Sequence, residues 1–156
     1  MFGRTNSRHR RGTTIVETAV VLPVFLILVF AIFEFGHAQL INNVMNSACR
    51  NAARVGAVEG STTAQVESRV EQSLGTVVPM QHVQIFVKNA SSLDASSTMP
   101  ESGQSLEDMP DINLEETESR TLFVVRAKVA YNDVAIVPMP FLKDVIIDAQ
   151  AFMRHE

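Results

Sequence analysis

The sequence predicts an α+β protein in which a long N-terminal transmembrane helix precedes a small domain built from one helix and an antiparallel sheet. Two observations indicate this organisation. Residues 15–33 form an almost uninterrupted apolar run, and the rest of the 156-residue chain passes through a helical pattern and then several strand-like patterns. A chain of this length accommodates one modest domain in addition to an anchor.

The apolar run from Ile15 to Phe33 has the length of a membrane span. Its nineteen residues contain one charge, Glu17, and only Thr18 and Pro23 as further interruptions. At about 1.5 Å per residue a helix of this length covers roughly 28 Å, close to the ~30 Å hydrocarbon core of a bilayer. A core helix of a soluble protein is rarely apolar on every face for so long, so we expect a transmembrane segment at about residues 15–35.

The flanking charges predict the orientation of this span. Four arginines and no acidic residue precede it, namely Arg4, Arg8, Arg10 and Arg11. Beyond Phe33, nine Lys or Arg residues stand against sixteen Asp or Glu residues. Because cytoplasmic flanks are enriched in Lys and Arg, we expect residues 1–12 to be a basic cytoplasmic leader and the acidic remainder to be periplasmic or extracellular. An acidic exported part argues against nucleic acid as a partner.

The helical pattern continues past the span, so one helix of about 70 Å is expected over residues 13–58. Pro23 should bend it, because proline removes one backbone hydrogen bond. Ala48, Ala52 and Gly56 recur every four residues near its end. Small residues at this spacing favour the close approach of a second helix, and a merely alanine-rich surface helix is the alternative.

The only cysteine, Cys49, lies on this stretch, so no intrachain disulfide is expected. A small apolar residue on a helix face is the expected role. An intermolecular bridge in an oxidising compartment is the alternative.

Residues 59–156 are expected to form the exported α+β domain. Thr62 and Gln65 fit a capping box, and the helix that follows carries an apolar stripe and ends at Gly75. The stripe consists of Val66, Val70 and Leu74. Strand-like patterns occupy residues 82–88, 121–137 and 145–153.

The segment between the first two strands, residues 89–119, is rich in Ser, Asp, Glu and Pro and has few large apolar residues. Such a composition buries too little surface to offset the chain entropy lost on ordering. We therefore expect a long, flexible and partly disordered loop at about residues 89–119.

No set of residues in the sequence predicts catalysis, a metal site or a cofactor. The histidines lack metal-ligand spacing, and no phosphate-binding glycine loop occurs. The histidines are His9, His37, His82 and His155. We expect no enzymatic activity, no metal and no cofactor.

One acidic stretch imitates the start of a calcium-binding loop, through Asp111, Asn113 and Glu115. Glu116 stands where that loop needs glycine, and Leu122 stands where it needs a bidentate glutamate. A solvated acidic loop is therefore the expected role of this stretch.

The N-terminal region resembles the type IV prepilin signature, because Gly12 follows a short basic leader and Glu17 stands five residues later in the apolar run. More narrowly, residues 10–58 resemble the TadE-like pseudopilins of tight-adherence (Flp) pilus systems. The shared features are R-G, V-E, L-P within the span, E-F-G at its end and N-A-A-R-x-G-A, with M-R-x-E closing the chain. One position departs from the family, since Thr18 stands where an aromatic residue often follows the acid.

The resemblance implies that a prepilin peptidase cuts after Gly12, that Thr13 becomes the N-terminus, and that Glu17 acts in processing or assembly. Cutting there frees an ammonium at Thr13, four residues from Glu17 and on the same side of a helix. A neighbouring subunit's ammonium is the alternative partner. Either pairing offsets a desolvation cost of about 2.5–3.5 kcal/mol for a charge at mid-bilayer. An acid that only reaches back to water is the competing interpretation.

Glu34 lies at the outer border of the span, where a carboxylate reaches water readily. A boundary marker and an assembly contact are both open for it.

These inferences lead to a non-enzymatic TadE-like minor pilin or pseudopilin, a single-pass protein of the inner membrane that acts in pilus or secretion-machine assembly. Its expected partners are the membrane, a prepilin peptidase and other pseudopilin subunits, which pack on the N-terminal helix. The expected assembly residues are Glu17, Glu34, Ala48, Ala52 and Gly56.

The alternative is a secreted or surface binding protein exported through a Sec signal peptide cut near Ala38. Gly36, His37 and Ala38 place small residues where a signal peptidase prefers them. The nineteen-residue span exceeds the usual 7–15-residue apolar region of a signal peptide, and Glu17 is out of place in one. A membrane-anchored enzyme is a third class of function, which no residues recommend.

Overall fold

The computed structural model describes residues 8–95, 106–138, 142 and 144–156, with side chains from Thr14 onward in these ranges except that of Ala95. The chain divides into two compact units, Met1–Gly36 and His37–Glu156. One helix, α1 (Arg8–Gly56), supplies residues to both units. The predicted fold class, a long apolar N-terminal helix followed by a helix and an antiparallel sheet, is confirmed.

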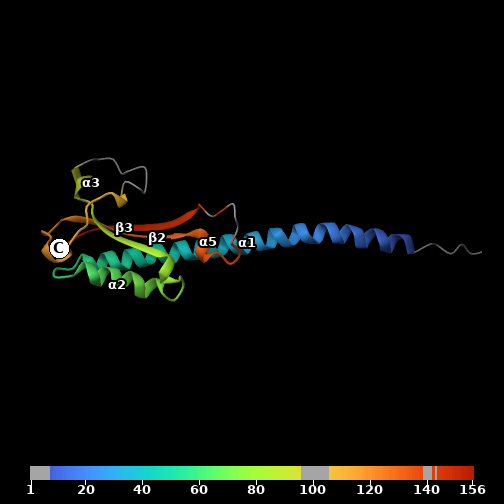
Figure 1. Cartoon of the computed structure of the whole chain (residues 1–156), viewed down its shortest axis with the longest axis horizontal. Coiled ribbons are helices and arrows are strands. Elements are labelled where there is room, and N and C mark those ends of the chain that lie inside the picture. Colours follow the sequence, from blue (N-terminus) through green and yellow to red (C-terminus); the bar gives the residue numbers. More distant parts are fainter. Residues whose placement is uncertain (1–7, 96–105, 139–141, 143) are drawn as a thin grey trace, which may run out of the picture. The chain divides into compact units, whose positions relative to one another are not determined.

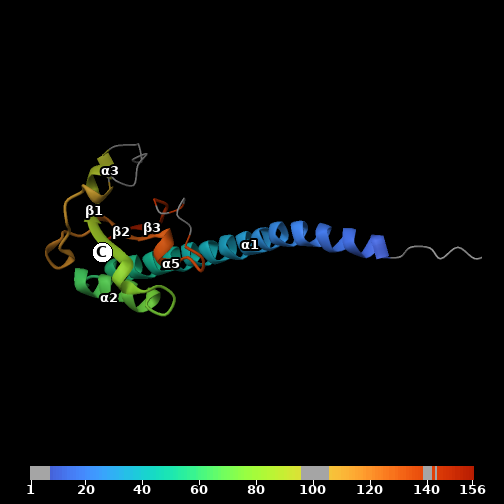
Figure 2. The same cartoon turned by 45° about the vertical axis from the view of Figure 1, so that its right-hand side comes forward.

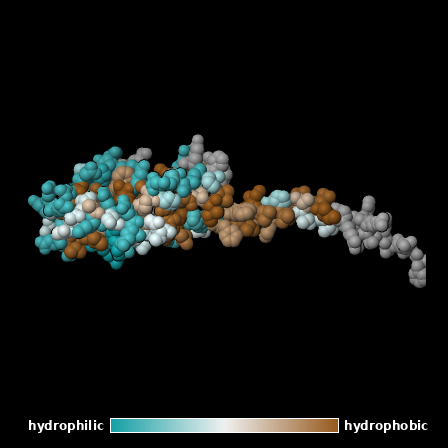
Figure 3. All heavy atoms as spheres, turned by 60° about the horizontal axis from the view of Figure 1, so that its bottom comes forward, coloured by the Kyte–Doolittle hydropathy of each residue, from teal (hydrophilic) through white to brown (hydrophobic). Residues whose placement is uncertain are grey.

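Helix α1 begins inside the predicted leader, at Arg8, and ends at Gly56, shortly before the predicted end. It continues through Pro23. In the first unit the described side chains of α1 are mostly exposed and apolar, as the hydrophobic colouring of this stretch in Figure 3 shows. The helix contains a window that is long and apolar enough to cross a membrane.

The second unit places α1 and α2 side by side against a three-stranded antiparallel sheet of order β1-β2-β3 (Figures 1 and 2). After α1 the elements are α2 (Thr63–Leu74), η1 (Met80–His82), β1 (Val83–Asn89), α3 (Ser91–Ala95), η2 (Leu114–Glu116), β2 (Leu122–Ala130), α5 (Tyr131–Val134) and β3 (Ile146–Arg154).

Helix α2 forms as predicted. The Thr62 hydroxyl accepts from the Gln65 backbone N–H at 3.1 Å, and the Gln65 side chain accepts from the Thr62 N–H at 3.2 Å. These two bonds satisfy donors that a helix start leaves unpaired. The predicted stripe of Val66, Val70 and Leu74 is fully buried.

Strand β2 is the centre of the sheet and is covered on both faces. Val83 to Asn89 of β1 pair with Val129 to Phe123, and β3 pairs with β2 from Leu122–Arg154 to Ala130–Ile146. One face of β2 points into the core shared with the helices, through Phe123, Val125, Ala127 and Val129.

The predicted strand over residues 121–137 is too long, because Tyr131–Val134 forms the short helix α5. The Tyr131 N–H donates to the Val145 carbonyl at 2.8 Å, and the Ala135 N–H donates to the Tyr131 carbonyl at 2.9 Å. Asn132 and Asp133 disfavour a strand interior, so the strand-like alternation of the flanking aliphatic residues was misleading here.

The predicted flexible, partly disordered loop over residues 89–119 contains local structure among its described residues. They contain α3 and η2 and bury three large aliphatic residues, Leu106, Ile112 and Leu114. The Thr63 hydroxyl donates to the Ile112 carbonyl at 3.0 Å and accepts from the Leu114 N–H at 3.1 Å. These few anchors fix the segment on the domain; residues 96–105 lie outside the described residues.

The face of the sheet away from the helices carries a charged network. The Arg126 guanidinium is nearly buried and lies 3.4 Å from Glu107 and 2.9 Å from Asp148. Lys128 Nζ donates to Glu107 at 2.7 Å, and this hydrogen bond, with the positive charges of Lys128, Arg126 and Lys88, holds the pKa of Glu107 below its usual range. The network joins residue 107 of the supposed loop to the sheet.

The C-terminus of α1 is held by Ser61, just after the helix, and by His155 and Glu156. The Gly56 carbonyl accepts from the Ser61 hydroxyl at 3.0 Å and lies 2.9 Å from His155 Nδ1. A carbonyl only accepts, so this geometry requires a proton on Nδ1. The Glu156 N–H donates to the Ala57 carbonyl at 2.9 Å. Carbonyls that a helix end leaves unpaired are thereby satisfied inside the protein.

Gly56 is the point of closest approach between α1 and the rest of the unit. A Cβ at this position would lie 2.8 Å from Val66 Cγ2, 3.0 Å from Phe123 Cζ and 3.1 Å from Leu114 Cδ1. Three elements therefore pack directly against the backbone of α1, at a distance that a side chain would prevent.

We expect Gly56→Ala to destabilise the second unit by about 1–3 kcal/mol, because the added methyl group overpacks the core. Denaturant unfolding of the detergent-solubilised protein, followed by the fluorescence of its single tyrosine, Tyr131, measures this change. Gly36→Ala is the matched control, since a Cβ there meets nothing within 4 Å. Equal unfolding midpoints for the Gly56 variant and the wild type would contradict the packing argument.

Candidate functional site: the N-terminal half of α1

The predicted processing bond, between Gly12 and Thr13, lies inside α1 rather than before it. Glycine has about 1 kcal/mol lower helix propensity than alanine, so Gly12 weakens the helix locally at the predicted bond. The side chain of Thr13 lies outside the described residues.

Glu17 is exposed on α1, with apolar neighbours along the chain. Thr13 and Glu17 belong to the same continuous helix, so their spacing of four residues puts them on one side of it. The pairing of Glu17 with a freed ammonium, in the same chain or in a neighbouring subunit, stays a prediction.

Thr18, which departs from the family pattern, satisfies its own hydroxyl. Thr18 Oγ1 donates to the Thr14 carbonyl at 2.8 Å, one turn earlier in α1. In hydrocarbon every polar group needs such an internal partner, and threonine commonly finds it four residues back in a helix. The residue beside Glu17 is therefore compatible with a lipid environment.

The described part of α1 before Phe35 exposes apolar side chains all around the helix. Their exposed fractions include 71% for Ile15, 66% for Val24 and 67% for Phe33. A helix that is apolar all round needs an apolar surrounding, which lipid or other helices supply. This is the surface that membrane insertion and helix packing would use.

The environment of Glu34 differs from the predicted one. It is only 4% exposed, so the expectation of a carboxylate that reaches water readily is wrong. The proposed role of Glu34 in assembly stays a prediction.

The small face of α1 is occupied within the chain. Ala48 and Ala52 are buried in the core of the second unit, and Gly56 packs against Val66 of α2. The close approach predicted from their spacing is thus made by the chain's own helix and sheet. A contact of these three residues with another subunit stays a prediction, and their burial does not favour it.

Cys49 belongs to the same buried face. It is fully buried, its Sγ lies 3.5 Å from the Ala149 carbonyl of β3, and burial raises the pKa of its thiol to about 11. This environment agrees with a core residue and disfavours an intermolecular bridge.

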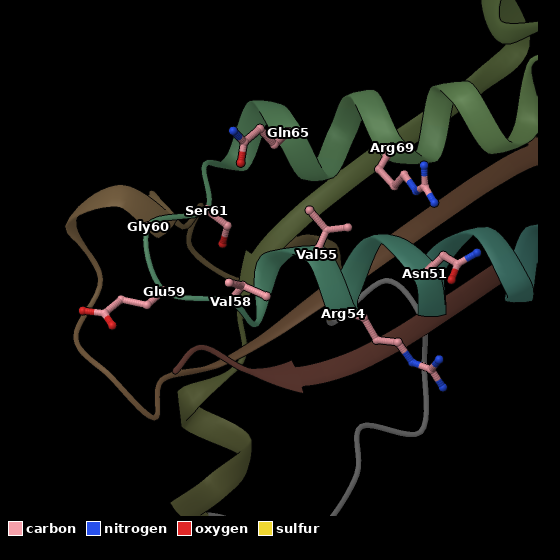
Figure 4. Close-up of a pocket in the computed structure, with 9 residues that line it drawn as sticks. All are labelled: Asn51, Arg54, Val55, Val58, Glu59, Gly60, Ser61, Gln65 and Arg69. Carbon is pink, nitrogen blue, oxygen red and sulfur yellow. The ribbon is translucent and has the colours of Figure 1, made fainter.

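A shallow groove of about 460 Å³ runs along the ends of α1 and α2 (Figure 4). Val55 and Arg69 point into the space between the two helices, whereas Arg54 points away from α2 in this view. The Arg69 guanidinium also donates to Gln72 at 3.0 Å. The groove is lined by Asn51, Arg54, Val55, Val58, Glu59, Gly60, Ser61, Gln65 and Arg69. Its arginines offer planar donors to an anionic group.

The polar residues considered in the sequence as metal ligands make structural contacts instead. Asp111 Oδ1 accepts from Lys88 Nζ at 2.6 Å, and His155 caps α1. Within the described ranges, no group of three or more His, Cys, Asp or Glu residues is arranged to hold a metal ion. The capping role of His155 escaped the sequence analysis, because it depends on Gly56, 99 residues earlier in the chain. The groove that Arg69 lines escaped it because the groove forms only when α1 and α2 pack together.

Residues 12–54 match the model of the family described as TadE-like protein. This segment is TadE-like. It contains Gly12, Glu17 and Glu34, and it ends shortly before Gly56, so the resemblance seen in the sequence is confirmed over this range. No curated protein and no solved structure matches the chain. The TadE-like segment and the apolar half of α1 together support a pilus-associated membrane protein, and α1 is the helix long and apolar enough to cross a membrane among the described residues.

We expect the Cys49 thiol of the folded protein to react very slowly with thiol reagents. At pH 8 a thiol with a pKa of about 11 is roughly 0.1% thiolate, against about a quarter for an ordinary thiol of pKa ~8.5. Labelling with a chromogenic disulfide reagent should therefore be at least ~100-fold slower than in denaturant. Labelling at equal rates in both states would contradict the burial.

The same shift predicts a pH dependence of stability. The unfolded thiol loses its proton at lower pH than the folded one, so the free energy of unfolding should fall as pH rises from about 8.5 towards 11. Cys49→Ala should remove this contribution.

Proposed function

We propose that the protein is a TadE-like pseudopilin of the inner membrane, matured by a prepilin peptidase that cuts after Gly12, and that it helps to assemble a pilus or secretion machine. The leader would lie in the cytoplasm and the second unit in the periplasm or outside the cell. The observation that carries this proposal is the exposed apolar half of α1, which lies in the TadE-like segment and bears Glu17 five residues beyond Gly12.

The division of α1 into two halves supports this role. After His37 the small face of the helix is buried by the chain's own domain, whereas before Phe35 apolar side chains are exposed. The exposed half remains for contacts with other subunits within the membrane. Heterologous contacts of this kind, repeated along an axis, build open helical arrays.

Glu17 would fix the axial register of these contacts. A carboxylate in hydrocarbon is costly unless it is paired, and the ammonium released at Thr13 is a partner of opposite charge. If that ammonium comes from a neighbouring subunit, the pair forms only at one axial offset between the helices. Glu17 would then select the register of assembly.

Processing is tested at the N-terminus of the protein isolated from its native host. Intact-mass and N-terminal peptide mass spectrometry should find Thr13 as the first residue. Gly12→Leu should retain the leader, whereas Gly3→Leu, the same change within the leader, should leave the cut at Thr13. An uncut Met1 or Phe2 start in a strain with an active prepilin peptidase contradicts the processing. A soluble product that begins at Gln39 would instead favour the Sec-exported alternative.

Assembly is tested with Glu17→Ala and Glu17→Asp. The alanine variant should insert into the membrane as well as the wild type but lose crosslinks to other pilus subunits by about tenfold or more, since 1.4 kcal/mol of lost pairing corresponds to a factor of ten. The aspartate variant, which keeps the charge, should retain most of them. Normal crosslinking of the alanine variant would remove Glu17 from the assembly contact.

A further inference from the structure

Exposed aliphatic side chains in the second unit are concentrated at one place. Among the described residues of this unit, the large hydrophobic side chains that are exposed are Leu40, Val58, Val77, Ile136, Val137, Val145 and Ile146. Four of them lie on the connection from α5 to β3 or at the start of β3, with exposed fractions from 42% to 62%. We call Ile136, Val137, Val145 and Ile146 the aliphatic patch.

Backbone bonds bring the two halves of this patch together. The Tyr131 N–H, at the start of α5, donates to the Val145 carbonyl at 2.8 Å, and Ala130 pairs with Ile146 across the sheet. The Ala135 N–H closes the turn of α5 on the Tyr131 carbonyl. Ile136 and Val137 follow directly, so all four residues lie at the same end of β2 and β3.

The underside of the connection is packed on the domain. Val134, Ala135 and Leu142 are partly buried against the core, and Ala38 of α1 packs against the same core. Figures 1 and 2 both show α5 beside α1. Ala38 is the second residue of this unit, so the patch belongs to the end at which α1 enters it.

We propose that the aliphatic patch rests on the membrane surface. The proposal depends on the proposed membrane span, because residues 15–35 of α1 are then in lipid. His37, at the same end of the unit as the patch, follows that span within two residues of the chain. Aliphatic side chains gain from leaving water for the boundary between headgroups and acyl chains.

The charges around the patch indicate which type of lipid surface, anionic or zwitterionic, it would bind. Asp133 and Asp144 are exposed beside it, and Asp133 lies 3.4 Å from His82 Nδ1. These carboxylates would repel a strongly anionic surface, so the insertion is driven by the aliphatic side chains and not by attraction to acidic lipids. A zwitterionic bilayer is the appropriate probe.

The test measures which solvent surrounds single nitroxide labels on the full-length protein in phosphatidylcholine vesicles. Labels are attached to Ile136→Cys and Ile146→Cys; Val24→Cys in the span and Ser68→Cys on exposed α2 are the two references. Unsubstituted protein controls for labelling at the buried Cys49. Power saturation compares collisions with lipid-soluble oxygen and with a water-soluble nickel chelate.

At positions 136 and 146 we expect an oxygen-to-nickel collision ratio several-fold above that of the Ser68 label. Ratios equal to that of Ser68, or protection from both reagents as in a protein contact, overturn the patch as a membrane surface while the Val24 label still reports lipid. A Val24 label in water overturns the span, and this proposal with it. Unchanged unfolding midpoints for the labelled variants show that the fold is intact.

Discussion

The packing of the small face of α1 against α2 and the sheet is the contact on which the second unit depends. At Gly56 the backbone itself is the surface that Val66, Phe123 and Leu114 touch, and one turn earlier Ala52 is fully buried. The two halves of α1 therefore have different surfaces. The first half is apolar all round, while the second half buries small residues and keeps Arg50 and Arg54 exposed. The change from large to small side chains after Phe35 marks the point at which the helix begins to pack against the chain's own domain.

Features governed by neighbours in the chain could be predicted from the sequence. The capping box of Thr62 and Gln65 needs only residues three apart, and the alternation of β2 follows from residues two apart. Features governed by distant partners could not. The spacing of Ala48, Ala52 and Gly56 predicts close packing but does not identify the partner. Likewise, Leu106, Ile112 and Leu114 are too few to indicate order until the surfaces that receive them are known.

The candidate site shows the same division. Gly12 and Glu17 could be found because their spacing along the chain is itself the signal, and the TadE-like match covers both. The burial of Glu34 and the groove that contains Arg69 depend on how elements pack, which no local pattern encodes. Thr18 was an unexplained departure in the sequence. The Thr18 hydroxyl donates to the Thr14 carbonyl within α1, so it needs no hydrogen-bond partner from the lipid.

The cap on α1 has a consequence for the order of folding during export. His155 and Gly56 are 99 residues apart, and β3, which leads to His155, follows the other described elements in the chain. The final carbonyls of α1 can therefore be covered only after β3 has reached the sheet. A chain interrupted before β3 would leave this helix end uncapped and open to proteolysis.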